Sequence, residues 1–169
     1  MTSQVRMIAD HVESRKVVLW AHNTHVGDPA AATARRVGEI TVGQQLRSEG
    51  GVFSVGMLTE RGLVRAALYV DTPDRVMRIR PALPESYSAV FAQAPHPSFW
   101  LLLEPGSAVT AALTPPRLER AIGVRYSRPT ERPSHYMRTS LPREFDAVIF
   151  LRQTHAVTPM RDRPARAGS

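Results

Sequence analysis

The stretch KVVLWAHNTHVGD, residues 16–28, carries an apolar run directly into two histidines with an asparagine between them. Residues 16–21 are too few for a core helix and rich in β-forming side chains, so they predict a strand buried on both faces. His22, Asn23 and His25 follow at the carboxyl end of this predicted strand. In open α/β sheets, ligands bind just beyond the carboxyl ends of strands. These three polar side chains therefore mark a candidate site.

Two helices flank this stretch in the sequence. Apolar residues between Val5 and Val12 recur at helical spacing and predict a helix over about residues 3–14. A second helix is predicted within residues 38–51, where Gly50 suits the C-terminal end. Helix, buried strand, loop and helix in succession are typical of an α/β sheet.

Short apolar runs predict further strands. Two of them, at residues 52–58 and 63–70, are separated only by TERG, whose Gly62 fits a tight hairpin turn. A short strand, a brief helix, an apolar strand, an irregular proline-rich segment and a last apolar strand follow, at residues 75–81, 85–93, 99–104, 114–144 and 145–151. We expect an α/β fold whose mixed, mostly parallel sheet has flanking helices and one β-hairpin.

Size and composition are those of one globular domain. The chain has 169 residues, of which 43% are hydrophobic and 22% are charged. It contains no cysteine, which excludes disulfides, thiolate metal ligands and a cysteine nucleophile. No segment has the apolar length of a signal peptide or a membrane span, so we expect a cytoplasmic protein that contacts no membrane.

The net charge of +7 comes almost wholly from arginine, because Lys16 is the only lysine. These arginines are scattered, and no zinc-finger spacing, aromatic RNA-binding run or basic helix collects them. We therefore expect no nucleic-acid partner; the charge reflects either a biased composition or an acidic partner. Residues 161–169 are polar and contain proline, which predicts a disordered basic tail.

The histidine pair carries groups that ester hydrolysis needs. Hydrolysis requires an activated water or nucleophile, and donors where negative charge develops on the carbonyl oxygen. Imidazole suits both tasks because its unperturbed pKa of about 6.5 lies near neutral pH. His22 and His25 can point into one pocket, with Asn23 orienting one of them. From spacing alone, the simpler interpretation is two polar loop histidines bonded to backbone groups.

Parts of two other kinds of site are also present. A catalytic zinc ion needs a third protein ligand, but His11 lies on the first helix and His96 in a proline-containing loop. Asp28 would have to reach back across Gly27. We therefore predict no metal. A serine nucleophile is disfavoured because no G-x-S-x-G elbow occurs.

A second polar cluster lies in the proline-rich segment. Glu131 precedes the tripeptide Ser134, His135 and Tyr136. These side chains either line a pocket with the histidine pair or anchor a loop through a buried tyrosine hydroxyl and a histidine hydrogen bond. The residue pattern leaves both interpretations open.

The segment VVLWAHNTHVGD resembles the WAHN-x-H-x-G-D signature of the erythromycin esterase family, whose members are also labelled succinoglycan biosynthesis proteins. Further matches follow in the family's order, namely GEITVGQQLR, VGMLTERGLVRAA, ERAIGVRYSRPTERPSHY and LPREFDAVIFLRQTHAVTPM. Residues 1–160 thus resemble the C-terminal portion of an erythromycin esterase-like domain. The sequence departs from the family near Glu85 and Ser88, where a Gly-Ser-Tyr-Glu pattern is usual, so no acidic role is carried over to position 88.

This resemblance implies a carboxylic ester hydrolase that acts on macrolide lactone-type substrates with histidine-activated water and no cofactor, and hence a role in antibiotic resistance. The matching positions are His22 and His25 for catalysis, and Asn23, Glu131 and His135 for substrate binding. The family's base is a histidine, helped by a glutamate, in an N-terminal part that residues 1–15 cannot replace. We therefore expect a truncated copy that is inactive without the missing N-terminal half. The alternative is a non-catalytic remnant or binding module of the same fold.

The predicted strands at residues 16–21, 99–104 and 145–151 are apolar throughout, as strands covered on both faces are. The sequence predicts only two long helices to cover them. We therefore expect an incomplete fold with exposed apolar faces and marginal stability when the chain is alone.

Overall fold

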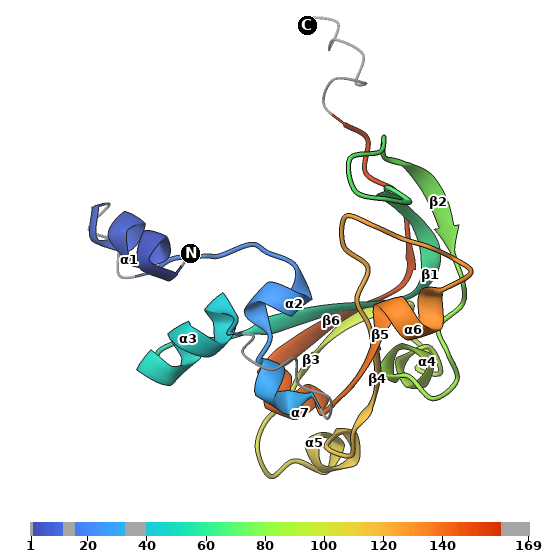
Figure 1. The fold of residues 1–169 in the computed structure, drawn as a ribbon. Helices are drawn as coiled ribbons and strands as arrows, with labels where there is room; N and C mark the ends of the chain where they lie inside the picture. The colour runs from blue at the N-terminus through green and yellow to red at the C-terminus, as the bar shows by residue number, and fades with distance from the viewer. Residues whose placement is uncertain (1, 12–15, 33–39, 160–169) are drawn as a thin grey trace, which may run out of the picture.

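The computed structural model describes residues 2–11, 16–32 and 40–159, so the boundary expected at residue 160 and the tail at 161–169 lie outside the described residues. Its main sheet has four strands in the order β2–β1–β6–β3 (Figure 1). The strands are β1 (Val55–Ala66), β2 (Arg75–Ile79), β3 (Ser98–Leu102) and β6 (Ala147–Thr154). β1 pairs with β6 in parallel, whereas β2 and β3 run antiparallel to their neighbours. The expected α/β class with a mixed sheet is confirmed, and one of its three described pairings is parallel.

A smaller sheet lies in the segment that was expected to be irregular, and this expectation was wrong. β4 (Arg117–Arg120) pairs antiparallel with β5 (Tyr136–Thr139), and the short helices α6 (Glu131–His135) and α7 (Leu141–Glu144) accompany them. Each strand has only four residues and little apolar alternation, so no period-two pattern predicted either strand. Pairing between distant segments, not local pattern, makes these strands.

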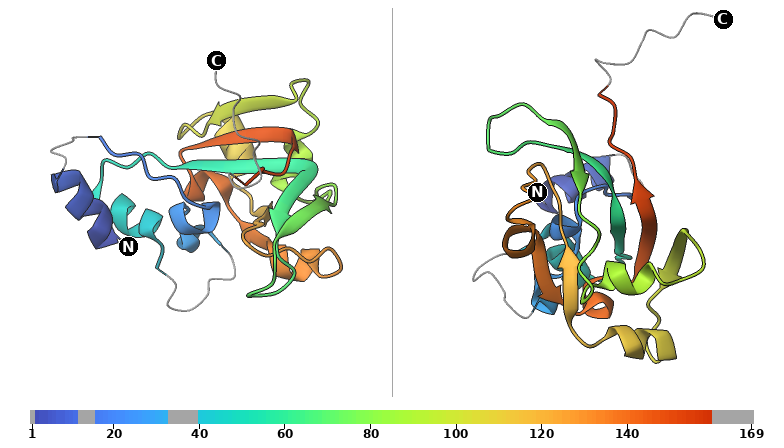
Figure 2. Two further views of the ribbon diagram at one scale, coloured as in Figure 1. Left: turned by 90° about the horizontal axis from the view of Figure 1, so that it is seen from above. Right: turned by 90° about the vertical axis from the view of Figure 1, so that its right-hand side faces the viewer.

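The helices agree with the sequence where it gave a clear pattern. The first ones are α1 (Thr2–His11), α2 (Asn23–Val26), the 3-10 turn η1 (Pro29–Ala31) and α3 (Val42–Glu49); α4 (Tyr87–Phe91) and α5 (Ala108–Leu113) follow later. The helix expected over residues 3–14 is confirmed up to His11, and its last residues lie outside the described part. α3 ends at Gly50, whose φ of 84° is a conformation that glycine adopts without strain. Both α1 and α3 lie together at one end of the main sheet (Figures 1 and 2).

The hairpin expected at TERG does not form, because β1 runs through it as one continuous strand. Gly62 is the point at which β1 changes partner: it pairs with β6 before this residue and with β2 after it. Its φ is 138°, and a Cβ there would lie 2.3 Å from the carbonyl oxygen of Thr154. Glycine is therefore required for the close approach of two backbones, not for a turn. The hairpin of this fold joins β1 to β2 through residues 67–74.

The strand expected at residues 16–21 is also absent: this segment has no secondary structure and forms no ladder with any described residue. Val18 is 91% exposed and Trp20 is 82% exposed. A strand needs a backbone partner, and on the free edge of β1 the side chain of Asn23 bonds the backbone N–H and C=O of Met57. The apolar pattern thus predicted a burial that no described element supplies.

One face of the main sheet carries the core. Side chains from β1 and β6 pack there against α4, α5 and α7, which Figure 1 shows on the same side of the sheet. The buried members are Leu58, Tyr87, Phe91, Leu103, Leu113, Leu141, Phe145, Val148 and Phe150. A second, smaller cluster of Ala66, Ile79 and Tyr126 lies near β2.

The Tyr87 hydroxyl ties three segments of this core together. It lies 2.9, 3.1 and 3.0 Å from the carbonyl oxygens of Leu113, Pro115 and Thr139. It also accepts a hydrogen bond from the backbone N–H of Leu141 at 3.1 Å. The hydroxyl is fully buried, so it fixes the ends of α5 and β5 to the start of α7.

Replacing Tyr87 by phenylalanine is expected to lower the free energy of unfolding by about 1–3 kcal/mol, because a buried N–H and several carbonyls lose their partner. Urea denaturation measures this change. Tyr69 is 70% exposed, and Tyr69→Phe is the matched control with an expected change within about 0.5 kcal/mol. Equal changes in the two variants would show that the Tyr87 hydroxyl does not organise the core.

The opposite face of the main sheet is open. Met57, Ile149 and Trp100 are cross-strand neighbours there, as are Val55 and Leu102 on either side of β6. Trp100 is 70% exposed and Met57 is 41% exposed. We call Val55, Met57, Trp100, Leu102 and Ile149 the open face. A contiguous apolar surface of this kind is typical of a face that another element covers.

Candidate functional site

His22 is the N-cap of α2, and its ring is held from both sides. The backbone N–H of Thr24 donates to Nδ1 at 3.3 Å, and the Thr24 hydroxyl lies 2.9 Å from the same atom. Nε2 lies 3.0 Å from the carbonyl oxygen of Ile122. Because Nδ1 accepts a backbone hydrogen bond, the proton of the neutral ring is on Nε2 and is donated to Ile122.

Burial lowers the pKa of His22 below its ordinary value. The bond to the Ile122 carbonyl opposes this effect in part, and the nearby His25 adds to it. A half-buried imidazole with a lowered pKa is neutral at pH 7. It is therefore able to donate through Nε2–H without carrying a charge.

His25 lies one turn further along α2 and faces solvent. Its ring centroid is 6.5 Å from that of His22, with the two planes at 73°. The structure thus brings both predicted histidines together at one helix, but only His22 lines the adjacent cavity.

Asn23 is buried at the start of α2, 9% exposed. Its Nδ2 donates to the carbonyl of Met57 at 2.9 Å and to Glu119 Oε1 at 3.0 Å. Its Oδ1 accepts from the Met57 N–H at 3.0 Å. The amide thus substitutes for a neighbouring strand at this point of β1. Its substrate-binding role stays a prediction.

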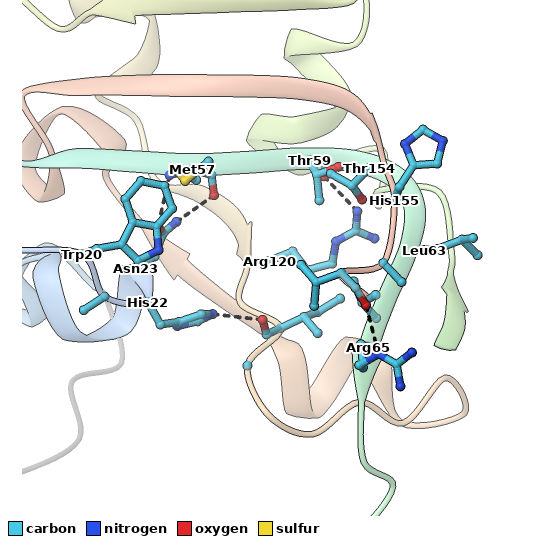
Figure 3. A pocket seen from close by; sticks show the side chains of 16 residues that line it. Trp20, His22, Asn23, Met57, Thr59, Leu63, Arg65, Arg120, Thr154 and His155 are labelled. Atoms are coloured by element: carbon cyan, nitrogen blue, oxygen red, sulfur yellow. Dashed lines mark hydrogen bonds between the residues drawn. The ribbon is translucent and has the colours of Figure 1, made fainter. Parts of the chain in front are cut away.

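A cavity of about 500 Å³ lies beside His22 (Figure 3). Its walls come from the segment before α2, from β1, from the loop after β4 and from the end of β6. Figure 3 shows Arg120 between the His22–Asn23 end and the Leu63–Arg65 end of this cavity. Most of the lining is apolar, with Trp20 at one end and His155 at another. An apolar cavity with a few polar groups is the usual form of a small-molecule site.

Arg120 is the best-bonded charged side chain of the cavity wall. Its guanidinium donates to Glu131 Oε1 at 3.0 Å and to the carbonyl oxygens of Thr59, Glu60 and Arg80 at 2.7–2.8 Å. Both members of the Arg120–Glu131 ion pair are almost completely buried. Arg120 was not predicted as a cavity residue; its only signal in the sequence is its place in the segment ERAIGVRYSRPTERPSHY.

Glu131 is 3% exposed and does not line the cavity. Besides Arg120, its carboxylate accepts a hydrogen bond from the Tyr126 hydroxyl at 2.8 Å. Burial and this carboxylate raise the pKa of Tyr126 to about 12. The structure therefore places Glu131 behind the cavity wall, where it holds Arg120. Direct contact of Glu131 with substrate stays a prediction.

His135 lies in the same region, at the end of α6. The backbone N–H of Ser127 donates to its Nε2 at 3.3 Å, and Nδ1 lies 3.3 Å from the carbonyl of Ala121. Its ring packs on Tyr126 at a centroid distance of 5.4 Å. These contacts match the loop-anchoring interpretation, and the cavity lining does not include His135. Its substrate-binding role is untested by this geometry and stays a prediction.

Two further observations concern the described residues as a whole. No group of three histidine, aspartate or glutamate side chains is placed to hold a metal ion there. None of the helices in the same part of the chain has the length and apolar character that spanning a bilayer requires.

The fold and the site define an α/β domain with a histidine-bearing cavity at the edge of a mixed sheet. The erythromycin esterase family model matches residues 1–154, and the chain belongs to this family. A succinoglycan biosynthesis protein has the same fold over 91% of this chain, with a TM-score of 0.73 and 18% identity. A protein from Bacillus cereus matches 91% of the chain at a TM-score of 0.70 and 19% identity.

An erythromycin esterase itself, a mutant of EreC in its open conformation, matches 90% of the chain with a TM-score of 0.55 and 15% identity. These three likenesses show the fold. The chain covers only 37%, 37% and 35% of the length of the three proteins, and it corresponds to a C-terminal part of the family domain.

Proposed function

We propose that this chain supplies the carbonyl-polarising half of a carboxylic-ester hydrolase site, with His22 as its central residue. The observation that supports this most is the neutral, half-buried His22 ring on the wall of an apolar cavity. The family relationship favours the same chemistry. The cavity's apolar lining suits a hydrophobic ester or a macrolide lactone, which is the finer proposal.

In this proposal His22 polarises the substrate. Its Nε2–H donates to the carbonyl of Ile122 in the present structure, and a substrate carbonyl oxygen takes that place when bound. Arg120 forms part of the same wall: Glu131 balances its charge, and its Nε–H has no hydrogen-bond partner among the described residues. His25, one turn away, positions the attacking water. The base that removes the proton of this water comes from the rest of the domain.

The partner that we propose is the N-terminal half of an erythromycin esterase-like domain, which also covers the open face. Trp100 and Met57 stand exposed on that face, as expected for a surface that is buried in a complete domain. Docking there places new side chains beside the exposed Trp20 and beside His22. Dimerisation through the open face is the competing outcome, and analytical ultracentrifugation of the chain alone distinguishes it.

A non-catalytic module of the same fold is the second candidate function. It is favoured by the fact that both ring nitrogens of His22 already have partners within the chain. In that case the His22–Asn23 segment only fixes α2 against β1, and the cavity binds a ligand without turnover.

Product analysis separates the two candidates. The chain is combined with the separately expressed N-terminal half of a family relative and incubated with a model lactone in ¹⁸O-labelled water. Ester hydrolysis predicts a product heavier by one water, with ¹⁸O in the new carboxyl group. Binding of the lactone without any mass gain would favour the non-catalytic module, and loss of turnover on adding a chelator would contradict the metal-free mechanism.

A further inference from the structure

Two carboxyl side chains lie buried directly behind the start of α2. Glu119 on β4 is 2% exposed, and Glu144 at the end of α7 is 6% exposed. Their side chains are in hydrogen-bonding contact with each other. Two neighbouring carboxylates in a buried site disfavour ionisation of both, because their charges repel each other and lack water. We therefore expect one of the two groups to keep its proton at neutral pH.

The surrounding hydrogen bonds favour a proton on Glu144. Asn23 donates to Glu119 Oε1 at 3.0 Å, and the Thr139 hydroxyl donates to Glu144 Oε2 at 2.8 Å. Glu119 Oε2 is buried and has no hydrogen-bond partner among the described residues. A protonated Glu144 would supply this partner, because its O–H can donate to Glu119 while its other oxygen accepts from Thr139.

The carboxyl pair touches both ends of α2. At the N-terminal end, Glu119 accepts from Asn23, the residue that follows His22. At the C-terminal end, Gly27 packs so closely that a Cβ there would lie 2.5 Å from Glu144 Oε1. These two contacts act together with the bonds of Asn23 to Met57 and of Ser54 to the Val26 carbonyl to hold the short helix on which the candidate catalytic histidines stand.

We propose that Glu119 and Glu144 form a proton-sharing carboxyl pair that positions Asn23 and α2, and thereby holds His22 in its place on the cavity wall. Both are positioning residues, because they act through Asn23 and do not line the cavity. Their relevance to catalysis rests on the proposed function of His22. The geometry of the carboxyl pair is independent of that proposed function.

The electrostatic surroundings favour retention of the proton. Burial, first of all, raises the pKa of Glu119, and burial followed by the charge of Glu119 raises the pKa of Glu144 to about 10. Asp28, in front of η1, adds to the effect on Glu144, whereas the hydrogen bond from Thr139 opposes it. Burial raises the pKa of Tyr87 of α4, and the charge of Glu119 adds to this rise.

A raised carboxyl pKa has a definite consequence for stability. The folded pKa of Glu144 lies above the unfolded value of 4.5, so its contribution is fully present below pH 4.5. This contribution is lost as the pH rises toward 10. Glu144→Gln carries a permanent amide in place of the protonated acid, so its stability should lose this part of the pH dependence.

Infrared spectroscopy of the whole chain observes the shared proton directly. At pH 8 the wild-type chain should retain one protonated-carboxyl band, and Glu144→Gln should lack it. Glu85→Gln is the matched control, since Glu85 is an accessible carboxylate paired with Arg132, and it should keep the band. Absence of any protonated-carboxyl band from the wild-type chain above pH 7 would overturn the shared proton.

The titration of His22, followed by NMR, tests the positioning role. In Glu144→Gln the His22 pKa should stay lowered, because the amide donates to Glu119 and accepts from Thr139. In Asn23→Ala and in Glu119→Leu it should rise toward 6.5 as the ring becomes exposed, and the double variant should rise no further than either single one. A folded Glu119→Leu chain with the wild-type His22 titration would overturn the proposal.

If the Glu119→Leu chain does not fold, Glu144→Gln still tests the proposal. Glu144→Gln is isosteric with the protonated acid and should fold. If its free energy of unfolding falls between pH 7 and pH 10 as steeply as that of the wild type, the proposed carboxyl pair is refuted. None of these readouts requires turnover. The proposal of a carboxyl pair can therefore be refuted without refuting ester hydrolysis, and ester hydrolysis can be refuted without refuting the pair.

Discussion

Replacing Arg120 by methionine is expected to lower the free energy of unfolding by about 3–5 kcal/mol, because it leaves a buried charge without its partner. The carboxylate of Glu131 would keep only the hydroxyl of Tyr126. The carbonyls of Thr59, Glu60 and Arg80 would lose their donor at the same time. This one side chain joins β4 to β1 and α6, so its loss should also open the cavity.

The chain contains a matched control for this experiment. Arg132 pairs with Glu85 at 2.7 Å, but its side chain is 66% exposed, whereas that of Arg120 is 2% exposed. Arg132→Met should change the free energy of unfolding by no more than about 1 kcal/mol, because exposed ion pairs are screened by water. Urea denaturation of both variants measures the difference. Equal destabilisation by the two substitutions would contradict the structural role of the Arg120–Glu131 pair.

Replacing His22 by alanine is expected to reduce ester turnover of the assembled domain about 10²–10⁴-fold, the range typical of a lost proton-transfer or polarising group. The measurement is kcat of the chain combined with the N-terminal half of a relative. His25→Ala should have a smaller effect, since that ring faces solvent 6.5 Å away. His96, in the exposed loop before β3, provides the control variant with unchanged turnover.

The pH dependence gives this prediction a second readout. Burial lowers the pKa of His22, so the neutral ring persists to a pH below the ordinary value of 6.5. Activity that depends on neutral His22 should therefore decline only on the acid side of 6.5. Turnover that survives His22→Ala with an unchanged pH profile would remove His22 from the mechanism.

Local patterns predicted those elements that carry their own signals. The apolar run 145–151 predicted the strand that the structure shows as β6. Helical spacing with a terminal glycine predicted α3, which ends at Gly50. Residues 16–21 had an equally clear apolar pattern, but they form no strand. An apolar run indicates burial, whereas a strand also needs a backbone neighbour. That neighbour is not among the described residues.

The strands β4 and β5 show the opposite failure. Residues 117–120, with sequence RLER, contain one apolar side chain, and only their pairing with residues 136–139 makes them a strand. Such pairing joins segments with more than ten residues between them. No short window of sequence contains it.

The candidate site was predictable in part for the same reason. His22, Asn23 and His25 are adjacent in the sequence and share one helix, so the motif placed them together. Arg120 reaches the cavity from β4, where its guanidinium donates to the carbonyls of Thr59 and Glu60 on β1. The partners that bury Glu131 and Glu119 likewise come from distant elements.

We propose that this chain is the C-terminal part of an ester-hydrolase domain, and that the open face receives the N-terminal part. Titrating the chain with the N-terminal half of a relative, while following hydrolysis of a model lactone, tests this most directly. We expect no measurable turnover by the chain alone, and a rate that rises and saturates at one N-terminal half per chain. Saturable, His22-dependent hydrolysis by the chain alone, or a stable one-to-one complex without any hydrolysis, would contradict it.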